Sequence, residues 1–165
     1  MKSAVLILVA AGLAVTGACT DTMMGGSTIV SSIIPSGGAT DVDPSSPVTV
    51  MFSGPMQAGM EAYMALHLGA VAGPAVPGAW AWSDGLTRLT FTPADPLEAG
   101  TMYVLHMGGG MMDADGDMLD FGHCGDAHGG QWATGGMMGG NGGMMGSGWQ
   151  HTNGSYGMVF SFTTR

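Results

Sequence analysis

Residues 79–92 read Ala79-Trp80-Ala81-Trp82-Ser83-Asp84-Gly85-Leu86-Thr87-Arg88-Leu89-Thr90-Phe91-Thr92. On both sides of the central Ser-Asp-Gly, large apolar side chains alternate with small or polar ones. A period of two places successive side chains on opposite faces of a strand. Glycine tolerates the positive φ that tight hairpin turns require. The stretch therefore predicts two antiparallel strands, 79–82 and 86–92, with Leu89 and Phe91 facing the core.

Five further short runs outside this hairpin also have the composition of strands. Val48–Phe52 is the clearest, because its apolar residues at every second position share one face. The other four runs are residues 28–34, 63–68, 101–107 and 158–164. Seven short strands separated by turn residues predict an all-β fold of the sandwich type. Residues 57–62 are expected to add a single helical turn.

The overall composition excludes several classes of protein. The chain has 165 residues, of which 31 are Gly and 17 are Met, and only 9% are charged. Gly destabilises a helix interior by about 1 kcal/mol, so a helical bundle is not expected. The net charge is −9 with only three basic residues. There is therefore no cationic surface with which to bind nucleic acid or an anionic membrane.

Several sequence blocks resemble one family, in the same order along the chain. Residues 35–42, 47–56, 89–93, 96–103 and 160–164 are similar to the bacterial Ig-like domain of the S-layer (SbsA) type. The resemblance implies a seven-stranded Ig-like β-sandwich that serves as a spacer or adhesive module on cell-surface proteins. It brings no catalytic residues with it.

Two smaller resemblances accompany this one. Leu97-x-x-Gly100-x-x-Tyr103 resembles a tyrosine corner, in which a buried ring returns its hydroxyl to nearby backbone. Residues 35–42 are also similar to the opening of periplasmic copper-resistance proteins of the CopC type, which are Ig-like sandwiches too. The N-terminal His ligand of those proteins is absent here, so this second resemblance implies the fold alone.

The first residues have the layout of a secretory signal. A basic residue, an apolar run over residues 4–15 and small residues lead to Cys19. Cys19 after Gly-Ala resembles the lipobox of bacterial lipoproteins, which implies a diacylated Cys at the mature N-terminus. The alternative is ordinary signal-peptidase cleavage, with Cys19 lost or idle.

These features predict the organisation of the chain and its place in the cell. We expect a signal peptide at 1–18, a lipidated tether at 19–27 and an Ig-like domain at 28–165. The protein is then exported and held on a membrane of the cell envelope by its acyl chains. In a Gram-negative host, this is the outer membrane or the periplasmic side.

A long extra segment interrupts the family pattern before the last strand. Residues 113–119 fit the short turn of the family, but the last strand begins only near Gly157. Two similar Gly/Met blocks, 135–139 and 142–146, lie between them. Loops longer than about 12–15 residues are uncommon and are usually functional or disordered. We expect a flexible Gly/Met/His-rich insertion at 120–157.

Soft metal ligands are concentrated in and beside this insertion. Thioether and thiolate sulfur select Cu(I), and imidazole binds copper or zinc. The sequence therefore favours capture of a soft metal, Cu(I) or Ag(I). The candidate ligands are His106, Met107, Met111, Met112, His123, Cys124, His128, Met137, Met138, Met144, Met145 and His151.

The sequence is compatible with more than one function. The chain is either a metal-capturing envelope lipoprotein or a structural or adhesive surface module with an inert loop. Its partners are then the membrane through the anchor, metal ions or cell-surface components. Sacrificial oxidation of Met to sulfoxide is a third possibility.

Three further features have simpler interpretations. No nucleophile has a recognisable base and orienting group, so we expect no enzyme activity. Residues 113–117 have the Asp spacing of a calcium loop but lack its later ligands, so a polar turn is expected. His67 is expected to have a structural role.

Overall fold

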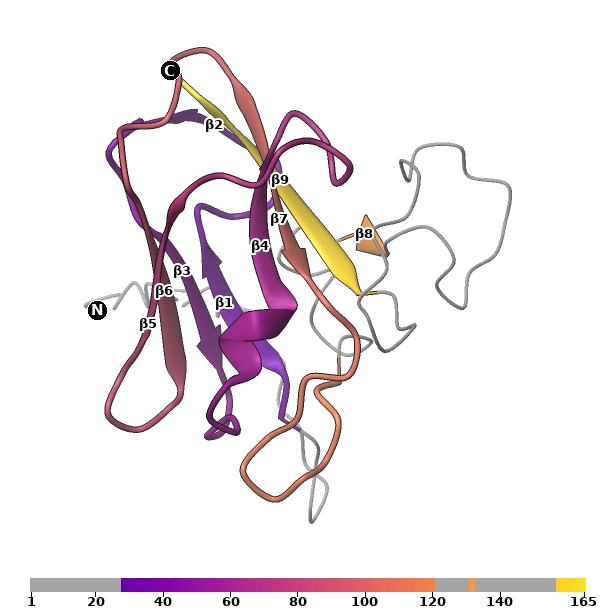
Figure 1. Ribbon diagram of the computed structural model, residues 1–165. Helices are drawn as coiled ribbons and strands as arrows, with labels where there is room; N and C mark the ends of the chain where they lie inside the picture. The colour runs from indigo at the N-terminus through magenta and orange to yellow at the C-terminus, as the bar shows by residue number, and fades with distance from the viewer. Residues whose placement is uncertain (1–27, 121–130, 133–156) are drawn as a thin grey trace, which may run out of the picture.

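The computed structural model describes residues 28–120, 131–132 and 157–165, which form two β-sheets (Figure 1). The first sheet has four strands in the order β1-β3-β6-β5, and every pairing in it is antiparallel. Its strands are β1 (Val30–Ile34), β3 (Val48–Phe52), β6 (Arg88–Pro93) and β5 (Gly78–Trp82).

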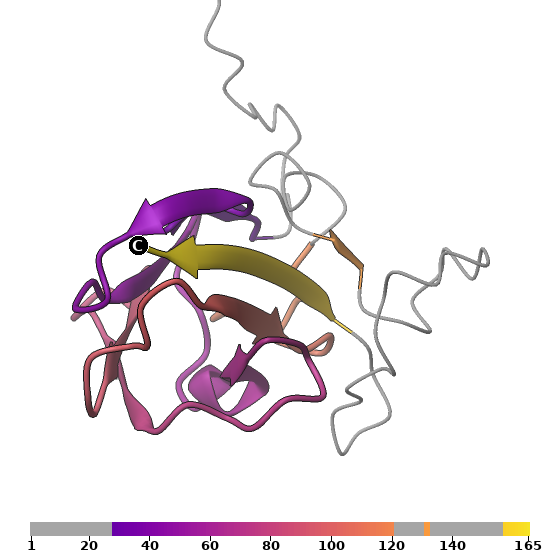
Figure 2. The ribbon, with the colours of Figure 1, turned by 90° about the horizontal axis from the view of Figure 1, so that it is seen from above.

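The second sheet has the order β2-β9-β7-β4, and a short strand, β8, also pairs with β9. Figure 2 shows β9, β7 and β4 following one another across this sheet. A 3₁₀ turn, η1 (Met60–Tyr63), directly precedes β4. The strands are β2 (Ala39–Val42), β9 (Met158–Thr164), β7 (Met102–Met107), β4 (Met64–Leu68) and β8 (Gln131–Trp132).

The predicted all-β Ig-like sandwich is confirmed, with two short strands more than expected. All seven predicted strands are present, and β2 and β8 bring the described residues to nine. The sequence of β2 shows no clear alternation, and Asp41 within it has a positive φ of 57°. This short strand pairs with β9 in parallel and with an irregular register. The predicted helical turn occurs as η1, a few residues later than expected.

The predicted hairpin of residues 79–92 forms, but its second strand begins at Arg88 rather than at residue 86, and the positive φ expected of the turn glycine is taken by Leu86, at 52°. β5 pairs with β6 from Gly78 opposite Pro93 to Trp82 opposite Leu89. Leu89 and Phe91 are buried, and the ring of Trp80 lies 4.8 Å from that of Phe91.

The core lies between the two sheets and is built from the alternating apolar residues of both. Phe160, Leu105 and Leu66 come from the second sheet, and Val50 and Leu89 from the first; all five are at most 1% exposed. In the part of the chain that the structure describes, no helix is long and apolar enough to cross a membrane.

Candidate metal-binding site

Four of the twelve candidate metal ligands lie in the described residues: His106, Met107, Met111 and Met112. The other eight lie outside them, as does the predicted lipidation site Cys19. These eight are His123, Cys124, His128, Met137, Met138, Met144, Met145 and His151.

Met107 and Met111 are completely buried in the apolar core. Met107 lies directly opposite Met64 on β4 and Met158 on β9. The three side chains form a row across the second sheet, and all of them face the core. Methionine fills irregular apolar spaces well because its side chain is flexible. The positions of Met107 and Met111 therefore favour a packing role for both residues.

Met112 has a different environment, because it lies at the surface beside two other methionines. Met112 is 38% exposed and Met118 is 60% exposed. These two residues face each other in an antiparallel bridge. The backbone N–H of Met112 donates to Sδ of Met60 over 3.2 Å. Met60, Met112 and Met118 thus form a surface thioether group.

Sequence reasoning left Met60 and Met118 out of the candidate ligands. Met118 had a usable signal, since Met112 and Met118 stand symmetrically on either side of the predicted turn 113–117. Met60 had none, because it reaches the group from η1, more than fifty residues earlier in the chain. Met60 comes close to Met112 only when this end of the sandwich has folded.

The turn that joins Met112 to Met118 is held by the carboxylate of Asp113. One oxygen accepts the backbone N–H groups of Asp115 and Asp117, at 3.1 and 2.9 Å. The other oxygen accepts the hydroxyl of Thr28 at 3.1 Å. Both oxygens are therefore used within the fold. No group of three or more acidic, His or Cys side chains in the described residues is arranged to hold a metal ion. The geometry is that of a polar turn.

These contacts also change the acidity of Asp113. Burial acts to raise the pKa of this carboxyl, but hydrogen bonds from Asp117, Thr28 and Asp115 outweigh it and hold the pKa below its ordinary value of 3.8. A carboxyl with a lowered folded-state pKa contributes stability above its unfolded-state pKa. That contribution is lost as the pH falls through the folded-state value.

We expect Asp113→Asn to reduce the free energy of unfolding by about 1–2 kcal/mol at pH 7. The difference from the parent is expected to shrink at pH 3, because the unfolded chain takes up a proton on Asp113 below its ordinary pKa, which reduces what the folded-state carboxylate contributes. Urea denaturation at both pH values measures this. Asp84→Asn, in the exposed hairpin turn, is the matched control and is expected to change stability by less than about 0.5 kcal/mol. An equal effect of Asp113→Asn at both pH values would contradict the lowered folded-state pKa of Asp113.

His106 lies on the face of β7 that points away from the core. Its neighbours Leu105 and Met107 belong to the core cluster, whereas His106 does not. His106 is nevertheless completely buried. It lies opposite Ala65 on one side and Val159 on the other.

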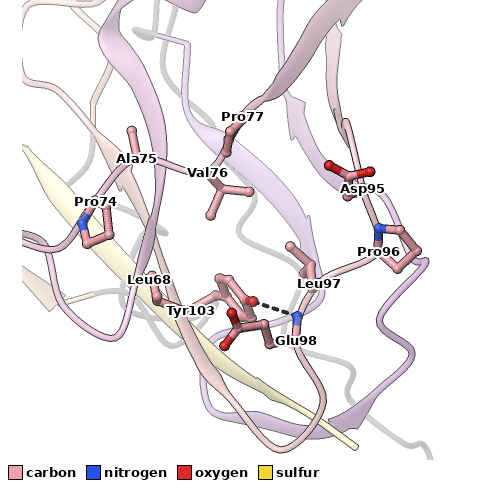
Figure 3. Close-up of a pocket in the computed structure, with 10 residues that line it drawn as sticks. All are labelled: Leu68, Pro74, Ala75, Val76, Pro77, Asp95, Pro96, Leu97, Glu98 and Tyr103. Carbon is pink, nitrogen blue, oxygen red and sulfur yellow. Dashed lines mark hydrogen bonds between the residues drawn. The ribbon is translucent and has the colours of Figure 1, made fainter.

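An apolar cleft lies elsewhere, beside the tyrosine corner. It has a volume of about 270 Å³ and is lined by Leu68, Val76, Leu97, Tyr103 and several prolines (Figure 3). The hydroxyl of Tyr103 accepts the backbone N–H of Glu98 at 2.8 Å, as the figure shows. The predicted return of the tyrosine hydroxyl to nearby backbone is therefore present.

The comparisons with known proteins identify the family of this chain. The family model described as "Bacterial Ig-like domain" matches residues 27–122, which is more than half of the 165 residues. The chain belongs to the bacterial Ig-like domain family. The S-layer (SbsA) subtype stays a prediction. No curated protein matches the sequence.

Several solved structures are similar to this chain at low sequence identity. The S-layer protein rSbsC(31-844) is 18% identical to this chain. The match covers 57% of this chain and 12% of the S-layer protein, with a TM-score of 0.42. PcoC, a methionine-rich copper resistance protein from Escherichia coli, is 12% identical over 85% of this chain and 100% of its own, with a TM-score of 0.48. L,D-transpeptidase 1 from Mycobacterium tuberculosis is 20% identical over 47% of this chain and 34% of its own, with a TM-score of 0.38.

These likenesses concern the fold alone. This chain spans only 12% of the S-layer protein and 34% of the transpeptidase. At TM-scores below 0.5, none of the three carries an argument about function.

Proposed function

We propose that this chain is a non-catalytic protein of the bacterial envelope whose Ig-like domain captures a soft monovalent metal, Cu(I) or Ag(I). The observation that carries the proposal is the surface thioether group of Met60, Met112 and Met118. Met112 and Met118 are exposed and face each other there, and the sulfur of the half-buried Met60 lies against the backbone of Met112, so an ion can reach the group from solvent.

The chemistry of the group matches a soft ion. Thioether sulfur is a soft donor that selects Cu(I) over harder cations. It has no proton to lose, so binding through it is not weakened in mildly acidic surroundings as binding through imidazole or thiolate is. The net charge of −9 attracts cations to the protein.

The position of the group connects it with the insertion predicted at 120–157. The loop that carries Met112 and Met118 follows β7 at the end where β9 begins (Figure 1). Asp120, the first residue of the predicted insertion and the last described residue before position 121, donates its N–H to the carbonyl of Thr28 at 2.9 Å. The chain thus enters the insertion directly after the thioether loop. We propose that the insertion supplies further ligands, among them His123, Cys124 and His128.

We also propose that a lipid on Cys19 anchors the protein to the envelope membrane. Its support is the layout of residues 1–19. The anchor and the metal site are independent. We expect Cys19→Ala to lose acyl labelling. Unchanged labelling together with unchanged membrane fractionation would contradict the lipid anchor but not the metal site.

The metal proposal is tested by anaerobic titration of the chain, purified from the envelope of an expressing bacterium, with Cu(I) against a chromogenic chelator. We expect the triple variant Met60→Leu, Met112→Leu, Met118→Leu to bind Cu(I) at least about tenfold more weakly than the parent, a loss of about 1.4 kcal/mol. Leucine keeps the size and apolar character of methionine, so the fold is retained.

The matched control is the double variant Met51→Leu, Met102→Leu, which removes two exposed thioethers from other parts of the sandwich. It is expected to bind as the parent does. A third variant lacks residues 121–156 and reports the contribution of the insertion. Equal Cu(I) affinity in the parent, the triple variant and the deletion variant contradicts the proposal. A structural or adhesive Ig-like module with an inert loop then explains the chain.

A further inference from the structure

Two buried histidines share the outer face of the second sheet. Along β4, Met64 and Leu66 face the core, so His67 faces outward; along β7, His106 faces outward for the same reason. His67 lies opposite Val104, two residues from His106. The two histidines are therefore diagonal neighbours on one face of an antiparallel pair, a separation that long side chains span.

The imidazole of His67 is held in one tautomer by the backbone. Its Nδ1 lies 2.9 Å from the carbonyl oxygen of Gly73. A carbonyl only accepts, so Nδ1 carries the proton and Nε2 of the neutral ring presents a lone pair. The segment after β4 fixes this contact, because Leu68 donates its N–H to Pro74 and Val76 donates to Leu66.

The lone pair of His67 has no protein partner in the described residues. His67 is only 5% exposed, and its Nε2 is buried without a hydrogen bond there. Buried polar atoms are almost always satisfied, so an exception points to a bound species. A ring whose other nitrogen donates to a backbone carbonyl has the orientation that proteins give to metal-binding histidines.

We infer that His67 and His106 form a second metal site, a pair of imidazoles that binds Cu(I) or Ag(I) on the sheet face. His106 completes the pair from the adjacent strand, where it is 0% exposed. This site uses nitrogen ligands and is independent of the surface thioether group.

The charge of the surroundings favours a monovalent ion. In the described residues, no acidic or Cys side chain joins these histidines in a group of three or more. A divalent ion held by two neutral ligands keeps its full double charge in a buried place, at a large desolvation cost. A monovalent d¹⁰ ion can be held by as few as two donors and brings half that charge.

The test is nitrogen NMR of the whole, ¹⁵N-labelled chain titrated with Ag(I), a redox-stable probe for the same ligands. Before Ag(I) is added, we expect His67 to show the Nδ1–H tautomer. With Ag(I), its Nε2 resonance is expected to shift and to show coupling to silver, and His106 is expected to respond with it. His106→Phe keeps an aromatic ring in the buried position and is expected to weaken the response of His67 at least about tenfold, or about 1.4 kcal/mol.

The Met60→Leu, Met112→Leu, Met118→Leu variant separates this site from the thioether group, since the His67 response is expected to persist in it. An unchanged Nε2 resonance at saturating Ag(I) overturns the inference, and a buried water is then what satisfies the ring. Loss of the response only in the methionine variant also overturns it. A His67 response with no effect of the methionine variant on Cu(I) affinity keeps this site and removes the thioether proposal.

Discussion

Gly157→Ala is expected to lower the free energy of unfolding by about 3 kcal/mol. Gly157 comes directly before β9, beside the end of β7. A Cβ built on Gly157 would lie 1.6 Å from the carbonyl oxygen of Met107 and 2.7 Å from Cα of Gly108. Both are backbone atoms, so no side-chain rotation relieves the overlap, and one of the two strands has to move.

This displacement affects the part of the sheet that carries His106. Val159 lies opposite His106, and Met158 lies opposite Met107. Chemical denaturation of the parent and the variant measures the loss of stability. Gly85→Ala is the control, since the nearest atom to its added Cβ is 3.8 Å away. Its expected change is less than about 0.5 kcal/mol. Equal stability of Gly157→Ala and the parent would show that the two strands do not approach so closely.

The strands of the sandwich are readable from the sequence because one face of each is buried. A buried face forces every second residue to be apolar, as in Val48, Val50 and Phe52, all at most 5% exposed. β7 is less regular, because His106 on its outer face is buried as well. β2 and β8 are four and two residues long. Strands that short form because they pair with β9. The alternation of apolar residues within such a short segment does not reveal this pairing.

The candidate site is less predictable, because it depends on contacts between distant parts of the chain. The sequence located the richest region of soft ligands but could not separate the buried Met111 from the exposed Met112, which are adjacent. It also gave no reason to connect Met60 with Met112. For His67, the sequence suggested a structural role; its contact with Gly73 is local, but the lack of a partner for its buried Nε2 in the described residues is visible only in the folded chain. The diagonal neighbour His106 becomes visible only from the register of β4 and β7.

Met107→Ala is expected to lower the free energy of unfolding by about 2–5 kcal/mol, the range for removing a large buried side chain from a core. Met107 is 0% exposed and lies in register between Met64 and Met158. Truncation opens a space at the centre of this row, and the paired backbones on both sides limit how far it can close. Thermal or urea denaturation measures the loss.

Met107→Leu distinguishes a packing role from a metal-binding role for the same residue. Leucine nearly conserves the volume, so the expected loss of stability is less than about 1.5 kcal/mol. It removes the sulfur, yet Cu(I) affinity is expected to stay at the parent value, because an ion at Met107 would have to leave water for an apolar core without a compensating charge. A tenfold weaker affinity in Met107→Leu, with the fold intact, would instead make this buried methionine a ligand. Met112→Leu alone is the informative comparison, since its sulfur belongs to the surface thioether group and its loss is expected to weaken Cu(I) binding.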